Sequence, residues 1–157
     1  QSAGAYMESV KDDQLVYQIA DYIKTQGNDT RALFVQLDDM DGAGHSFGYG
    51  SQKYYEQLEK TDNNVGVILN AIREAGLMDE SLILMVTDHG GKGTGHGGTS
   101  PEEKTVFWAA HGPNIKPGTT ITDSVMNKDT AAVVAKALRL EQPEAWDAEV
   151  PEYLFKK

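Results

Sequence analysis

The sequence has no cysteine among its 157 residues. Disulfide bonds and thiolate zinc sites are therefore excluded, and a metal site would have to use nitrogen and oxygen ligands. No apolar run approaches the roughly 20 residues of a membrane-spanning helix, so no membrane span is expected. Basic residues are few: 14 Lys and Arg stand against 24 Asp and Glu, and the net charge of −10 repels nucleic acid polymers and anionic membranes. A phosphate ester can still bind where metal ions reverse the local field.

The N-terminal residues Gln1-Ser2-Ala3-Gly4 contain neither methionine nor the pattern of a signal peptide, so we expect a cut end there. The length suits one domain over residues 1–157 with a buried core. The compartment is left open, with an extracytoplasmic (periplasmic or secreted) location favoured.

Apolar residues follow helical spacing in some segments and form short continuous runs in others. The first helix is predicted between an N-cap at Asp12-Asp13 and a stop at Gly27-Asn28. Further helices are predicted over about residues 51–75 and 127–140, the latter with Val133, Val134 and Leu138 directed inward, and strands over residues 32–37, 81–87 and 105–110. Strands without polar alternation, separated by helices, predict an α/β sheet with helices on both faces.

Histidines and aspartates follow two of these strands in glycine-rich segments. Asp41 and His45 come after the first strand in a predicted loop, Asp88 and His89 after the second, and His96 shortly beyond. Ligands gather at the carboxyl ends of strands in such sheets. Taken singly, each residue is better explained by turn capping or solvation, but the recurrence of the pattern favours a metal site.

These motifs resemble those of the alkaline phosphatase superfamily, in its type I phosphodiesterase/nucleotide pyrophosphatase branch. Asp41-Gly-Ala-Gly-His45 is similar to the Asp-x-x-Gly-His motif, Thr87-Asp88-His89-Gly90 to the second motif and Gly95-His96-Gly97 to the last. Residues 106–116 resemble the apolar strand and Gly-Pro turn that follow. The resemblance covers residues 32–140 and implies an alkaline phosphatase-like sheet, in which this chain is the C-terminal portion of a catalytic domain.

The resemblance also implies two divalent metal ions, zinc or else manganese, and metal-dependent hydrolysis of phosphodiester or pyrophosphate bonds in small phosphate esters. Asp41, His45 and His96 would hold one ion, and Asp88 and His89 would contribute to the other. Three further residues receive weaker roles. Asp38 and Asp39 would orient the ligand histidines, and Lys92 would contact a substrate phosphate. Simple solvation is the alternative for each of them.

The chain departs from the family pattern before Asp41, because no strand leading to Thr or Ser at a helix start precedes it. We therefore expect the nucleophile and the N-terminal strands to be absent from this chain. A sheet edge exposed by that absence would favour self-association. His111, where relatives tend to have an aromatic residue, receives no ligand role. The alternatives are a phosphomutase- or sulfatase-like relative on the same fold and a non-catalytic metal-binding fragment.

Overall fold

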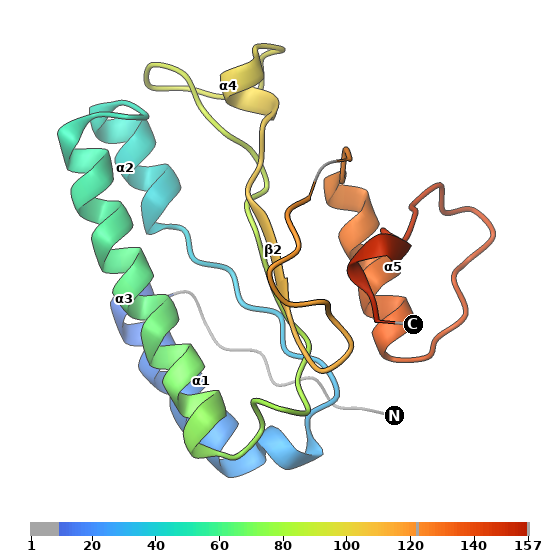
Figure 1. The fold of residues 1–157 in the computed structure, drawn as a ribbon. Helices are drawn as coiled ribbons and strands as arrows, with labels where there is room; N and C mark the ends of the chain where they lie inside the picture. Colours follow the sequence, from blue (N-terminus) through green and yellow to red (C-terminus); the bar gives the residue numbers. More distant parts are fainter. Residues whose placement is uncertain (1–9, 122, 157) are drawn as a thin grey trace. The chain divides into compact units, whose positions relative to one another are not determined.

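The computed structural model describes residues 10–121 and 123–156, which form two compact units (Figure 1). The helical unit comprises residues 10–78 and 91–97, and the sheet unit comprises residues 79–90 and 98–156 without residue 122. The expected cut end at residues 1–4 lies outside the described residues. The single domain over residues 1–157 stays a prediction.

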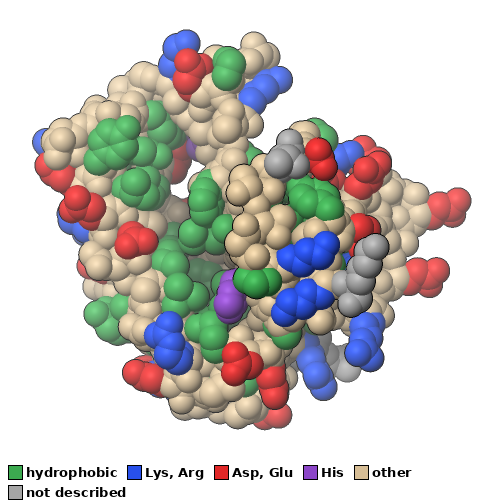
Figure 2. Space-filling model, in the orientation of Figure 1, with side chains coloured by type: hydrophobic (Ala, Val, Ile, Leu, Met, Phe, Trp, Pro, Cys, Tyr) green, Lys and Arg blue, Asp and Glu red, His purple; other side chains and the backbone are tan. Residues whose placement is uncertain are grey.

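The helical unit is built on two helices that pack lengthwise, α1 (Asp12–Gln26) and α3 (Gln52–Glu74). Its buried core joins α1 to Ala71 of α3, with partly buried residues of α3 around it. The α1 members are Ile19, Ala20 and Ile23, which recur at the spacing of one helical face. In Figure 2, hydrophobic side chains are also visible among charged ones at the left of the view, where these helices lie.

The ends of these helices test the capping signals. Gly27 follows α1 as predicted, and α3 confirms the predicted helix over residues 51–75, with the Ser51 hydroxyl accepting the Tyr54 N–H at 3.2 Å. The N-cap at Asp12-Asp13 was wrong by one position, because Lys11 is the N-cap and the aspartates occupy the first turn. There the Asp12 carboxylate accepts N–H groups from another helix, so it is not available to its own.

Residues 32–37 do not form the predicted strand. They have no partner strand among the described residues, and Phe34 is 87% exposed. Apolar runs indicate that a segment can be extended and buried, but a ladder of hydrogen bonds also needs a neighbouring strand. The prediction was wrong because that neighbour is missing from the sheet that the structure describes.

The segment with Asp41 and His45 was predicted as a loop and is instead helix α2 (Asp39–Phe47). The Asp12 carboxylate accepts the backbone N–H groups of Asp38 and Asp39, each at 3.0 Å. These bonds satisfy donors that a helix start leaves without partners, which offsets the low helix propensity of two glycines.

The sheet unit contains two antiparallel strands, β1 (Ile83–Val86) and β2 (Trp108–His111), with Ile83 opposite His111 and Val86 opposite Trp108. Shorter helical elements accompany them: α4 (Pro101–Lys104), α5 (Asn127–Ala137) and the 3-10 turn η2 (Glu152–Leu154). The structure is thus mixed helix and small antiparallel sheet, consistent with a fragment of an α/β domain. The larger sheet with helices on both faces was predicted, whereas the described residues form two strands only.

Helix α5 corrects one inward assignment. Val133 is fully buried, as predicted, whereas its neighbour Val134 is 36% exposed. At about 100° per residue, Val134 lies on the side of α5 opposite the arc that contains Ala132, Val133 and Ala135. Ala132 and Ala135 complete the buried face instead.

Candidate metal centre

Helix α2 places Asp41 and His45 on one face, because residues four apart are neighbours on a helix surface. Their side chains approach within 3.4 Å, from His45 Nε2 to Asp41 Oδ2. Both side chains are partly exposed. The helix therefore presents one imidazole nitrogen and one carboxylate side by side to an incoming ligand.

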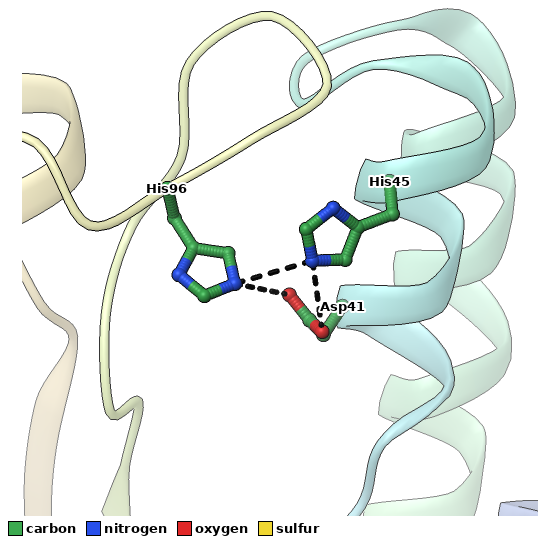
Figure 3. A group of neighbouring side chains, drawn as sticks. All are labelled: Asp41, His45 and His96. Atoms are coloured by element: carbon green, nitrogen blue, oxygen red, sulfur yellow. Dashed lines mark hydrogen bonds and ion pairs between the residues drawn. The ribbon is translucent and has the colours of Figure 1, made fainter.

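The third member comes from the loop of residues 91–97. A backbone bridge between Lys92 and Gly95 narrows this loop, and Gly93 and Gly97 adopt positive φ angles of 60° and 95° that glycine tolerates. His96 projects from the loop toward α2, and the three side chains converge as Figure 3 shows.

The distances within this cluster fit one small divalent ion. The Nε2 atoms of His45 and His96 are 3.2 Å apart, and His96 Nε2 is 3.5 Å from Asp41 Oδ1. Zinc–nitrogen and zinc–oxygen bonds of about 2.0–2.1 Å in a tetrahedral site require ligands about 3.3–3.4 Å apart. Within the described residues, the three offer ligand atoms that all lie within 4.8 Å of one another. The donor set and its spacing therefore fit a zinc-like ion.

The protonation of His45 supports the same role. Its Nδ1 lies 2.8 Å from the carbonyl oxygen of Thr94. Because a carbonyl can only accept, Nδ1 carries a proton, and in the neutral ring Nε2 then has its lone pair on the side of Asp41 and His96. A backbone carbonyl bonded to the far nitrogen is the usual partner of a metal-ligating histidine.

Asp88 and His89 belong to the sheet unit and directly follow Thr87 at the end of β1, as predicted from the strand. His89 Nε2 lies 3.5 Å from Asp88 Oδ2, and His89 Nδ1 lies 2.9 Å from the carbonyl oxygen of Gly90. The Asp88 side chain is 85% exposed, and its backbone carbonyl accepts the Asn127 amide at 2.8 Å. These two residues form a carboxylate–imidazole pair with the same histidine tautomer.

The weaker candidates lie close to the cluster in sequence. The Asp38 carboxylate accepts the Gln36 amide at 2.8 Å, and burial, followed by the charges of Asp12 and Asp13, raises the pKa of Asp39. The backbone N–H of Lys92 donates to Gly95 at 2.9 Å. The orienting role of the two aspartates stays a prediction, and the Thr94 carbonyl lies beside His45 Nδ1.

Two contributors were not identified from the sequence. The Thr94 carbonyl gives no signal there, since every residue has one. The second contributor is Tyr49, whose hydroxyl donates to Asp41 Oδ1. The only available signal was its position in Gly48-Tyr49-Gly50, four residues after His45.

None of the helices that the structure describes is both long and apolar enough to cross a bilayer.

Similarity to curated proteins is moderate. The chain is 29% identical to the phosphopentomutase of Agathobacter rectalis and 30% identical to that of Clostridium perfringens, in each case over 73% of the chain and 27% of the relative. It is 23% identical to the ectonucleotide pyrophosphatase/phosphodiesterase family member 1 of Mus musculus, over 54% of the chain and 10% of that protein.

The chain thus spans about a quarter or less of the curated relatives it matches. No solved structure matches it significantly. The model of the family described as type I phosphodiesterase/nucleotide pyrophosphatase matches residues 2–148, which is nearly the whole chain. The chain therefore belongs to the type I phosphodiesterase/nucleotide pyrophosphatase family, within the alkaline phosphatase superfamily.

Proposed function

We propose that this chain is the metal-holding, C-terminal part of the catalytic domain of a two-zinc enzyme that hydrolyses phosphodiester or pyrophosphate bonds. The observation that carries the proposal is the convergence of Asp41, His45 and His96 at ligand distances. Asp88 and His89 contribute to the second ion. Family membership and the pyrophosphatase/phosphodiesterase named among the relatives support the reaction class.

The number of ligands favours a catalytic site over a structural one. Structural zinc sites are closed by four protein ligands, whereas catalytic sites have three and leave one position for water or substrate. Asp41, His45 and His96 supply three, and all are partly exposed to solvent. A bound divalent ion would neutralise charge on a phosphoryl oxygen and orient the attacking and leaving groups.

The residues of this chain would hold the metal ions, and backbone groups orient the histidine ligands. His45 presents Nε2 because Thr94 fixes its Nδ1 proton, and His89 is fixed in the same way by Gly90. The chain has an excess of acidic over basic residues, so its overall field disfavours anionic esters. Positive charge held by these ligands would reverse that field locally and select small phosphate esters.

A phosphomutase is the second candidate, because three of the similar proteins carry the name phosphopentomutase and align over 73% of the chain. Assays of the protein extended to the length of its relatives separate the two. Release of nitrophenol from a nitrophenyl phosphodiester supports the hydrolase, whereas interconversion of pentose phosphates without phosphate release supports the mutase.

The nucleophile and the N-terminal strands are part of the proposal as elements outside this chain. With zinc present, we expect the 157-residue chain to show little or no turnover of a nitrophenyl phosphodiester. Vigorous hydrolysis by pure material would overturn that assignment. An extracytoplasmic location is proposed as well, in keeping with the name "ectonucleotide pyrophosphatase" borne by a relative.

The metal assignment is tested by measuring zinc bound to the purified chain by atomic absorption and by titration calorimetry. We expect His45→Ala to lose the site formed with Asp41 and His96. The matched control is His111→Ala, which removes an exposed histidine at the end of β2 in the sheet unit. Equal zinc stoichiometry and affinity in the two variants would refute the ligand assignment.

A further inference from the structure

We infer that Tyr49 is a positioning residue for the Asp41–His45–His96 site. Its hydroxyl fixes the Asp41 carboxylate, and its ring holds the loop that carries His96 in place. The inference rests on the proposed metal-binding function. It assigns to Tyr49 no contact with the ion or the substrate.

The hydroxyl group of Tyr49 donates a hydrogen bond to Asp41 Oδ1. A carboxylate has about four lone-pair positions, so one bond from the phenol does not occupy all of them. Oδ1 faces His96 and Oδ2 faces His45 at 3.5 Å and 3.4 Å. Because the phenol fixes the rotation of the carboxylate, it decides which oxygen each histidine meets.

The ring of Tyr49 is held between two glycines from different segments. A Cβ atom at Gly44 of α2 or at Gly91 of the loop would overlap the ring carbons. Neither glycine has a positive φ angle, so the space taken by the ring is what requires glycine there. The ring thus fills the gap between the helix that carries Asp41 and His45 and the start of the loop that carries His96.

The backbone of Tyr49 joins the same two segments. Its N–H donates to the Gly93 carbonyl at 2.8 Å. The ring also meets both histidines edge-on, with centroids 6.1 Å from His45 and 6.4 Å from His96. Hydroxyl, ring and backbone together hold the three ligands in place before an ion arrives, which lowers the cost of ordering them on binding.

The hydroxyl is tested by Tyr49→Phe, which keeps the ring. We expect zinc affinity, measured by competition with a chromophoric chelator, to fall about tenfold, since loss of an orienting partner costs roughly 10–100-fold. Stoichiometry and the urea midpoint of the metal-free chain should stay unchanged. The matched control is Tyr55→Phe, which removes the hydroxyl of a largely exposed tyrosine on α3 and should bind zinc as the unmodified chain does.

The packing of the Tyr49 ring is tested by Gly91→Ala, which retains the Tyr49 hydroxyl but places a methyl group in the space that the ring occupies. We expect weaker zinc binding, whereas Gly66→Ala on α3, where a Cβ meets nothing within 4 Å, should bind zinc as the unmodified chain does. A purely structural role is tested by the visible spectrum of the chain saturated with cobalt. Tyr49→Phe should shift the ligand-field bands because Asp41 turns, and an unchanged spectrum would overturn the positioning role.

The two proposals fail in different ways. If His45→Ala removes zinc and Tyr49→Phe binds it with unchanged affinity, the positioning role is wrong and the metal site stands. If the unmodified chain binds no zinc, the proposed function is wrong, and the inference about Tyr49 falls with it.

Discussion

A histidine becomes a directed metal ligand when one ring nitrogen is committed to a donor bond and the other is left with its lone pair. His45 and His89 both meet this condition, through the backbone carbonyls of Thr94 and Gly90 at 2.8 Å and 2.9 Å. Using backbone in place of carboxylates keeps additional negative charge away from the site. Each of the two histidines has one aspartate beside it, Asp41 for His45 and Asp88 for His89, and that carboxylate would offset positive charge bound at its own histidine.

Glu74 gives a test of charge pairing at the residue scale. Its carboxylate lies 2.6 Å from Lys24 Nζ, and the hydrogen bond and charge of Lys24 lower the pKa of Glu74. We expect Lys24→Met to return the Glu74 pKa upward toward its ordinary value, as measured by carbon-detected NMR titration. Lys53→Met is the control, because the Lys53 amine lies over the Phe47 ring. An identical Glu74 titration curve in Lys24→Met would contradict the pairing.

The same pair sets a pH window for stability. The folded-state pKa of Glu74 is lowered, so its contribution is present above the unfolded-state pKa and is lost as pH falls through the folded value. The pKa of Lys24 is raised, so its contribution is present below the unfolded-state pKa and is lost as pH rises through the folded value. Both side chains are exposed, and the effect on unfolding is small.

At the residue scale, the sequence indicated which residues are candidate ligands but not which other residues contact them. The Asp-x-x-Gly-His spacing identified Asp41 and His45, and His96 lies with them in the structure. The roles of Tyr49 and Thr94 depend on how a loop folds back on a helix, which a local motif does not contain. Asp88 and His89 remain a predicted pair for a second ion.

At the scale of elements, α2 decides whether Asp41 and His45 act together. In the predicted loop, the four-residue spacing would carry no geometric meaning, whereas in a helix it places both side chains on one face. The glycines pointed away from a helix because their intrinsic preference was weighed without tertiary contacts. The deciding contact is Asp12, 26 residues before Asp38 in the sequence.

Asp12→Asn tests that contact. Asp12 is only 3% exposed and accepts two backbone N–H groups at the start of α2. An asparagine offers one acceptor and sets an amide donor against the other N–H. We expect the free energy of unfolding, from urea denaturation, to fall by about 2 kcal/mol, with weaker zinc binding as a consequence.

The control for this change is Asp13→Asn, which alters an exposed aspartate in the same turn of α1. Its unfolding free energy should stay within about 0.5 kcal/mol of the unmodified chain, as for most surface changes. If Asp12→Asn and Asp13→Asn unfold at the same urea concentration, the carboxylate of Asp12 does not stabilise α2.

For the whole molecule, the outcome for residues 32–37 shows why sheets are harder to predict than helices. The bonds of a helix lie within its own sequence, so α3 followed from local spacing and caps. A strand needs a partner from elsewhere, and this chain spans 27% of the phosphopentomutases it matches. The apolar run identified a segment suited to a sheet without showing that its neighbour is present.

The same reasoning predicts self-association through the sheet. In the described part of the chain, β1 and β2 pair only with each other, so each has an outer edge whose backbone groups can bond to a second copy. Met85 in the middle of β1 is 43% exposed and adds apolar surface there. We expect sedimentation velocity to show dimers or larger species that increase with protein concentration.

Met85→Lys should reduce this association, because a lysine on an edge strand opposes pairing with another chain. Leu140→Lys is the matched control: it adds the same charge at an exposed hydrophobic residue of the sheet unit, beyond the end of α5. If both variants associate equally, the contact lies elsewhere than the sheet. A strictly monomeric profile of the unmodified chain at high concentration would instead mean that its strand edges are protected, as natural edge strands are by twist, charge or covering loops.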